Sequence, residues 1–162
     1  MGSGAWAQSM SIDQRLSELG ITLPQPAAPV AAYVPAVEHG GLLHISGQIS
    51  FAEDGSLITG RVGDDVDLDG GMAAAKRCGV MLLAQIKAAL GSLDRVERIV
   101  KLGVFVNSAS SFTDQPKVAN GASELMQDVF GEAGRHARSA VGVAALPLGV
   151  VVEVDAIVAV RG

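Results

Sequence analysis

Hydrophobic residues recur along the middle of the chain with two different periods, which predicts a helix, a strand and a second helix. Apolar residues spaced three and four positions apart predict a helix from Gly71 to Leu90 and another that begins after Asp114 and ends at Gly131. Between them, the segment 96–107 is apolar on both faces, which favours a central strand covered on each side.

The two ends of the chain predict a short helix and two pairs of strands. A short amphipathic helix is expected between Ser11 and Leu23, closed by Gly20. Two strands, 33–37 and 42–49, follow around a loop that contains glycine. Near the C-terminus, two apolar arms flank Leu-Pro-Leu-Gly, so the segment 136–156 is predicted to form a β-hairpin with a largely buried second strand. The order β-β-α-β-α-β-β predicts an α/β (α+β) fold, a mixed β-sheet with its two main helices packed on one face.

The length of the chain and its first residues suggest the domain organisation. A chain of 162 residues has room for one domain with a substantial core, and nothing in the sequence resembles a linker to a second. Residues 1–9 precede a second methionine, Met10, and are interpreted as an expression scar or a disordered extension. The predicted domain therefore spans residues 10–162.

Composition narrows the expected partners and location. Hydrophobic residues make up 49% of the chain and charged residues only 18%, so part of the apolar surface is expected to be covered by association with other chains. The net charge of −5 and the 4% of aromatic residues argue against nucleic-acid binding. With no membrane-spanning apolar run and no secretory signal, a cytoplasmic location and no membrane contact are expected.

The acidic run Asp65–Gly70 imitates the start of a calcium-binding loop, but the rest of the motif fails. Position twelve of such a loop is a bidentate glutamate, and here it is Lys76. Carboxylates near the positive start of a helix explain the run better. The three histidines lack the spacing of a zinc site, and the single cysteine, Cys78, is expected to be a small buried residue in a helix. Neither a metal nor a cofactor is expected.

Arg138, Glu153 and Asp155 are the charged exceptions within the apolar arms of the predicted hairpin. Burying an isolated charge costs on the order of several kcal/mol unless it is paired or used on a ligand. The planar fork of an arginine binds a carboxylate through two hydrogen bonds, and a glutamate can position a water and accept its proton. On facing arms, Arg138 and Glu153 would form either a site for a small carboxylate or an internal salt bridge, and the chemistry alone does not choose between them.

Several short elements also occur in a fixed order: Tyr33, Ser46 to Ile49, Ala137-Arg138-Ser139, Leu146-Pro147 and Val152 to Ile157. Their identity and spacing resemble the Rid family, the reactive intermediate imine deaminases, also called YjgF-like proteins and often labelled L-PSP endoribonucleases. The resemblance runs from about Ala32 to Val160, and the chain resembles a longer subgroup of the family.

The resemblance implies a chorismate-mutase-like fold and a homotrimer with three ligand-binding clefts at the subunit boundaries. It implies hydrolysis of 2-imino or 2-enamino acids to 2-oxo acids and ammonia without a cofactor. Arg138 would hold the substrate carboxylate and Glu153 would help to place the hydrolytic water. Cleft-lining positions match Tyr33, Ser46, Gly47 and Asn120, and also Ala140, which stands where well-studied members have a cysteine.

Two other activities stay open. Some family members carry a ribonuclease or translation-inhibitor label, which the acidic balance and the few stacking rings of this chain oppose. A non-catalytic trimer that binds a small carboxylic acid or an enzyme partner is favoured by the departures from the family pattern, namely Ala140, the added N-terminal segment and the loop 61–70.

Overall fold

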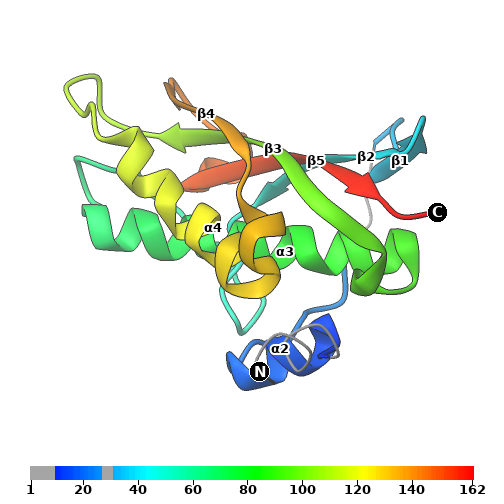
Figure 1. Cartoon of the computed structure of the whole chain (residues 1–162). Helices are drawn as coiled ribbons and strands as arrows, with labels where there is room; N and C mark the ends of the chain where they lie inside the picture. The colour runs from blue at the N-terminus through cyan, green and yellow to red at the C-terminus, as the bar shows by residue number, and fades with distance from the viewer. Residues whose placement is uncertain (1–9, 27–30) are drawn as a thin grey trace.

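The computed structural model describes residues 10–26 and 31–162, and the predicted scar or extension at residues 1–9 lies outside them. In the described part, two long helices, α3 (Leu68–Leu90) and α4 (Gln115–Phe130), cover one face of a five-stranded sheet (Figure 1). A short helix, α2 (Ile12–Glu18), lies on the far side of these helices from the sheet. The predicted α+β fold with its main helices on one face is confirmed.

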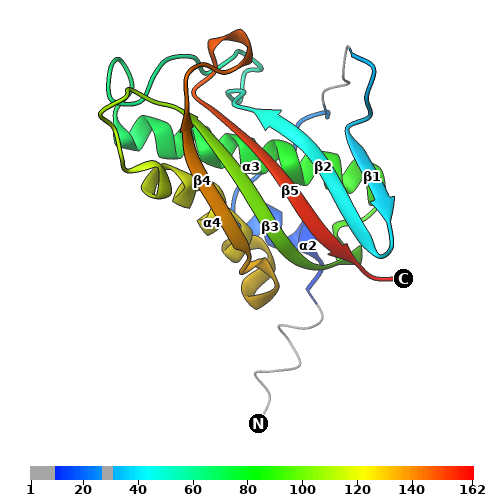
Figure 2. The same cartoon turned by 90° about the horizontal axis from the view of Figure 1, so that it is seen from above.

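The sheet is mixed, as predicted. Its strands are β1 (Ala36–His39), β2 (Leu42–Ile49), β3 (Val96–Asn107), β4 (Ala137–Val143) and β5 (Val152–Val160). They lie in the order β1-β2-β5-β3-β4 (Figure 2). Only β3 and β4 run parallel to each other, while the other three neighbouring pairs are antiparallel.

The predicted C-terminal hairpin is wrong, because β3 lies between its two arms. Arg138 on β4 stands opposite Leu102 on β3, which in turn stands opposite Ala156 on β5. The chain passes from β4 to β5 through a 3₁₀ turn at Pro147–Gly149. Leu-Pro-Leu-Gly is compatible with a tight turn or with this wider crossing, and the apolar strand β3 takes a partner on each of its edges.

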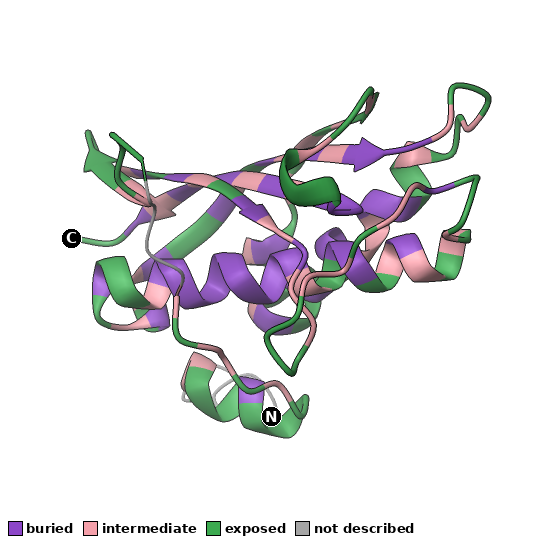
Figure 3. Ribbon diagram, turned by 180° about the vertical axis from the view of Figure 1, so that it is seen from behind, coloured by how far each residue is buried: buried purple, intermediate pink, exposed green. Residues whose placement is uncertain are grey.

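The core lies between the sheet and the two long helices (Figure 3). Along β5 the buried and the partly exposed residues alternate, and Val152, Val154 and Val158 are fully buried on the helix side. Cys78 on α3 is also fully buried, and its thiol donates to the carbonyl of Val152 at 3.3 Å. Burial raises the pKa of this thiol, which keeps it protonated and unreactive, as expected of a small core residue.

The opposite face of the sheet, here called the open face, is not covered by a helix in the described part of the chain. β3 is the central strand that its sequence predicts, but helices cover only one of its faces. On the open face Phe105 and Ile157 are half-buried and Val141 is 47% exposed. The second apolar face of β3 is therefore only partly buried within the described part of the chain.

Helix α3 begins at Leu68, three residues before the predicted start. The Asp67 carboxylate caps the helix by accepting a hydrogen bond from the Gly70 amide at 2.8 Å, and Asp69 lies in the first turn. Both carboxylates stabilise the positive end of the helix dipole. The acidic run is thus accounted for as a helix start, and the described residues contain no cluster of three or more His, Cys, Asp or Glu placed to hold a metal.

Candidate functional site

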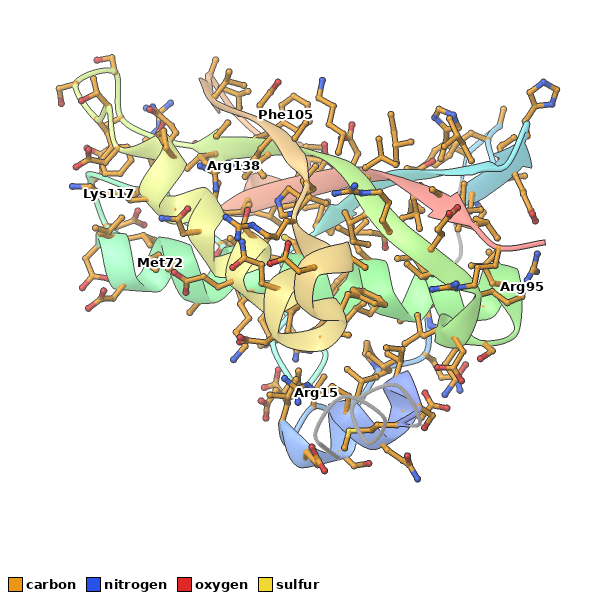
Figure 4. All side chains as sticks on the ribbon, in the orientation of Figure 1. Arg15, Met72, Arg95, Phe105, Lys117 and Arg138 are labelled. Carbon is orange, nitrogen blue, oxygen red and sulfur yellow. The ribbon has the colours of Figure 1, made fainter. Side chains whose placement is uncertain are left out.

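Arg138 extends from the start of β4 toward α4 (Figure 4). Its Nη1 donates to Asn120 Oδ1 at 2.8 Å and to Ser123 Oγ at 3.1 Å, and both acceptors are uncharged side chains of α4. In residues 10–26 and 31–162, no carboxylate lies within ion-pair distance of Arg138. The internal salt bridge, one of the two interpretations of this arginine, is therefore not what holds it.

A pocket of about 410 Å³ opens beside Arg138, between α4 and the start of β4. We call it the Arg138 pocket; its lining residues are Asn120, Ser123, Gln127, Arg135, His136 and Arg138. Two guanidinium groups and no carboxylate line it, so the pocket favours an anion. A larger pocket of about 560 Å³, bounded by residues 19–24 and α3, contains none of the predicted site residues.

Glu153 lies on β5 between two fully buried valines, so its side chain points to the open face of the sheet. There it packs over Gly47 of β2, where an added Cβ would lie 2.8 Å from Glu153 Cδ. Burial, and secondly the charge of Asp155, raise the pKa of the Glu153 carboxyl. A carboxylate with a raised pKa is a better proton acceptor at neutral pH than an ordinary one.

Ser46 and Gly47 form an irregularity in β2, where the register with β5 shifts between Ile45 and Gln48. The Ser46 hydroxyl donates to the Val34 carbonyl at 3.0 Å, and the Ser46 amide donates to the Pro35 carbonyl at 2.9 Å. These bonds hold the segment around Tyr33 next to β2. The first strand begins at Ala36 and not at Tyr33 as predicted, so Tyr33 lies before the sheet, 56% exposed.

The predicted site residues therefore form two groups. The first half-site contains Tyr33, Ser46, Gly47 and Glu153, and the second half-site contains Asn120, Arg138 and Ala140. Ala140 lies two residues after Arg138, on the same side of β4, and packs against the core.

The predicted meeting of Arg138 and Glu153 on facing arms of one hairpin is wrong. One strand separates β4 from β5, and Glu153 is opposite Phe105 while Arg138 is opposite Leu102. The two residues are thus roughly 10 Å apart across the sheet and roughly 10 Å apart along it. They also point to opposite faces, so the half-sites of one chain do not meet on one small ligand.

Sequence reasoning missed two residues that contact this arginine or its neighbours, Ser123 and His136. The His136 ring lies 2.9 Å from Ser123 Oγ, which accepts a hydrogen bond from Arg138. One signal was present in the sequence: Ser123 follows Asn120 by three positions, so on a helix the two share a face. His136 gave no comparable signal, because its contact depends on how β4 docks against α4.

The chain is similar to known proteins over most of its length. Residues 13–159 match the family described as "YjgF/chorismate mutase-like, putative endoribonuclease". Protein TCP17 of Trypanosoma cruzi is 55% identical over 88% of this chain and 90% of its own length. A 2-iminobutanoate/2-iminopropanoate deaminase of Dermatophagoides farinae is 28% identical over 87% of this chain and 95% of its own length. The crystal structure of protein Atu1372 from Agrobacterium tumefaciens has a TM-score of 0.86 and 48% identity, covering 93% of this chain and 92% of that chain.

Proposed function

Because the chain belongs to the YjgF/chorismate mutase-like family, as the resemblance to Rid proteins predicted, we propose that it hydrolyses reactive 2-imino or 2-enamino acids to 2-oxo acids and ammonia. The observation that carries the proposal is the Arg138 guanidinium, which uncharged acceptors hold beside an open pocket. The deaminase among its relatives is named for 2-imino acids, and these bear the carboxylate that such a guanidinium binds.

The proposed site is shared between chains in a homotrimer. Since the two half-sites of one chain lie on opposite faces of the sheet, a ligand can touch both only where two chains meet. A three-fold ring supplies three such boundaries, each joining the first half-site of one chain to the second half-site of its neighbour. The half-buried and exposed apolar residues of the open face, Phe105, Ile157 and Val141, would be covered by this association.

In the proposed mechanism, Arg138 binds the carboxylate of the imino acid and places its C=N carbon beside Glu153 of the neighbouring chain. Glu153 accepts a proton from a water molecule while the water oxygen attacks the imine carbon. Glu153 passes this proton to the imine nitrogen, which gives a neutral carbinolamine. The hydroxyl proton of the carbinolamine then moves through Glu153 to the nitrogen as the C–N bond breaks, so that ammonia leaves and the 2-oxo acid remains. Orientation and acid–base help are worth about 10²–10⁴-fold, which is sufficient for a substrate that also hydrolyses in water.

The test of this proposal is ammonia release from freshly generated 2-aminoacrylate by Arg138→Ala. We expect the rate to fall to that of the uncatalysed reaction while the oligomeric state stays the same, because a guanidinium aimed at a ligand is not a core contact. Arg161→Ala, which changes an exposed arginine beyond the end of β5, is the matched control and should keep full activity. Undiminished ammonia release by Arg138→Ala would contradict the proposal.

Ala140, in place of the cysteine of well-studied members, favours one other candidate, a trimer that binds a small carboxylic acid without turning it over. The ammonia assay separates the two candidates, because a binding protein would release no ammonia above the uncatalysed rate. A thermal-shift measurement would then show that 2-oxobutanoate stabilises it against heat. Against the endoribonuclease activity in the family description stand the net charge of −5 and the few aromatic residues.

A further inference from the structure

His136, Ser123 and Arg138 form a continuous chain of hydrogen bonds along one wall of the Arg138 pocket. His136 Nδ1 lies 2.6 Å from the carbonyl oxygen of Gly134, and His136 Nε2 lies 2.9 Å from Ser123 Oγ. Ser123 Oγ then lies 3.1 Å from Arg138 Nη1. This series of hydrogen bonds, here called the relay, begins at the backbone carbonyl of Gly134 and ends on Arg138, the proposed carboxylate-binding arginine.

The partners determine which atom donates at each step. A carbonyl oxygen only accepts, so His136 Nδ1 carries the proton and donates to Gly134. Nε2 of the neutral ring is then an acceptor, which directs the Ser123 hydroxyl hydrogen toward it. The oxygen of Ser123 keeps its lone pairs for the N–H of Arg138, which can only donate.

We propose that His136 is a positioning residue that, through Ser123, fixes the Arg138 guanidinium in the orientation that binds the carboxylate of the substrate. The proposal rests on the proposed function, because it assigns a role within the same site. Asn120 Oδ1 and Ser123 Oγ both accept from Nη1, and in the described part of the chain no acceptor bonds to Nη2 or Nε. The relay and Asn120 thus fix the position of Nη1 and leave the N–H groups of Nη2 and Nε for the ligand.

The charges around His136 favour the neutral ring that the relay needs. Burial lowers the pKa of His136, the Gly134 carbonyl opposes this effect, and the positive charge of Arg138 lowers the pKa further. Arg135 also lines the pocket, while the α4 residues there are uncharged. Around this segment, β3 contributes Arg98, which donates to the Arg135 carbonyl, and Lys101, which is opposite Ala137; the carboxylate of Glu132 lies 3.6 Å from Arg135.

A double-mutant cycle tests whether His136 acts through Ser123. The dissociation constant of 2-oxobutanoate is measured by calorimetry for the wild type, His136→Ala, Ser123→Ala and the double variant. We expect each single change to raise it about 3- to 10-fold, the range for one lost hydrogen bond. The double variant should bind no more weakly than Ser123→Ala alone, because both changes break the same relay. Independent, additive losses would overturn the proposal.

A conservative variant and a ligand-free signal separate positioning from a structural role. His136→Gln keeps a side-chain oxygen that can accept from Ser123, and it should restore binding to within about 2-fold of the wild type. The ¹⁵N resonances of the Arg138 guanidinium, assigned by their absence in Arg138→Lys, should indicate restricted rotation in the wild type and free rotation in His136→Ala. An unchanged signal in His136→Ala would refute the inference even in an active enzyme. Restricted rotation that is lost in His136→Ala, in a protein that binds no 2-oxo acid, would instead refute the proposed function and retain the relay.

Discussion

At the scale of single residues, two glycines allow the carboxylates of Glu153 and Asp155 to lie where they do. Gly47 on β2 has no Cβ, so the Glu153 side chain packs over its backbone. Gly103 on β3 does the same for Asp155, whose carboxylate occupies the place that a Cβ would take. The two carboxylates thus share the open face of the sheet, and the proximity of Asp155 helps to raise the pKa of Glu153.

Burial, and secondly the charge of Asp155, should set the pH at which activity is lost in acid. Glu153 must be ionised to accept a proton, so the rate should fall as the pH drops through its pKa. Removing the neighbouring charge in Asp155→Asn lowers this pKa, so the acid limb of the kcat/KM profile is expected to move to lower pH. Asp64→Asn, in a distant loop, should leave the profile where it is. An acid limb that Asp155→Asn does not shift would belong to a group other than Glu153.

The same raised pKa has a consequence for stability. A carboxyl whose pKa is higher in the folded chain than in the unfolded chain contributes its full stability at a pH below 4.5, its pKa in the unfolded chain. That contribution is lost as the pH rises through the folded pKa. Ionising Glu153 as the pH rises therefore costs stability, as is common for residues placed for function.

At the scale of elements, the sequence predicted the strands, the long helices and the pairing of β1 with β2, but not how β3, β4 and β5 pair. The apolar, β-branched composition of the segments around Arg138 and Glu153 predicted that both are strands. It contains no information on the neighbour of each strand, which is set by long-range packing of β3 between β4 and β5. For this reason the site residues could be chosen from the sequence while their arrangement could not.

Gly121 allows helices α3 and α4 to approach closely, and it is adjacent to Asn120 of the second half-site. A Cβ at this position would overlap the carbonyl oxygen of Met72 on α3. Gly121→Ala should therefore destabilise the protein by about 1–3 kcal/mol, the usual cost of forcing an added methyl into a packed interior. It should also weaken substrate binding, since α4 moves with Asn120. Chemical denaturation measures the first effect and KM the second.

The control for this variant is Gly162→Ala at the C-terminus, where an added Cβ meets no atom within 4 Å. It should leave both the midpoint of denaturation and KM unchanged. A Gly121→Ala protein as stable as the wild type would show that α3 and α4 can move apart without loss of stability, which would contradict the prediction.

At the scale of the whole molecule, the proposed trimer would account for both the low fraction of charged residues and the uncovered open face. Charged residues make up 18% of the chain, and apolar residues remain accessible on the sheet face away from α3 and α4. In the proposed trimer this face is covered, and the boundary that covers it also completes each site. No helix within the described residues is long and apolar enough to cross a membrane.

Mixing two inactive variants tests the shared site directly. Arg138→Ala keeps an intact first half-site, and Glu153→Gln keeps an intact second half-site. When equal amounts are unfolded and refolded together, a boundary is intact only if each variant supplies its undamaged half, which occurs for about a quarter of boundaries. We expect activity to recover from near zero to about a quarter of the wild-type value. Mixed trimers that native mass spectrometry detects but that stay inactive would show that the site is not divided in this way.

The separation of the two half-sites has a genetic consequence. In the proposed trimer, a chain that carries both Arg138→Ala and Glu153→Gln would inactivate the sites at both of its boundaries. Expressed in equal amount beside normal chains, it would leave only about a quarter of the boundaries working, where an enzyme with self-contained sites would keep about half. Such an allele would be dominant negative, because each double-variant chain inactivates sites that it shares with normal chains in the same assembly.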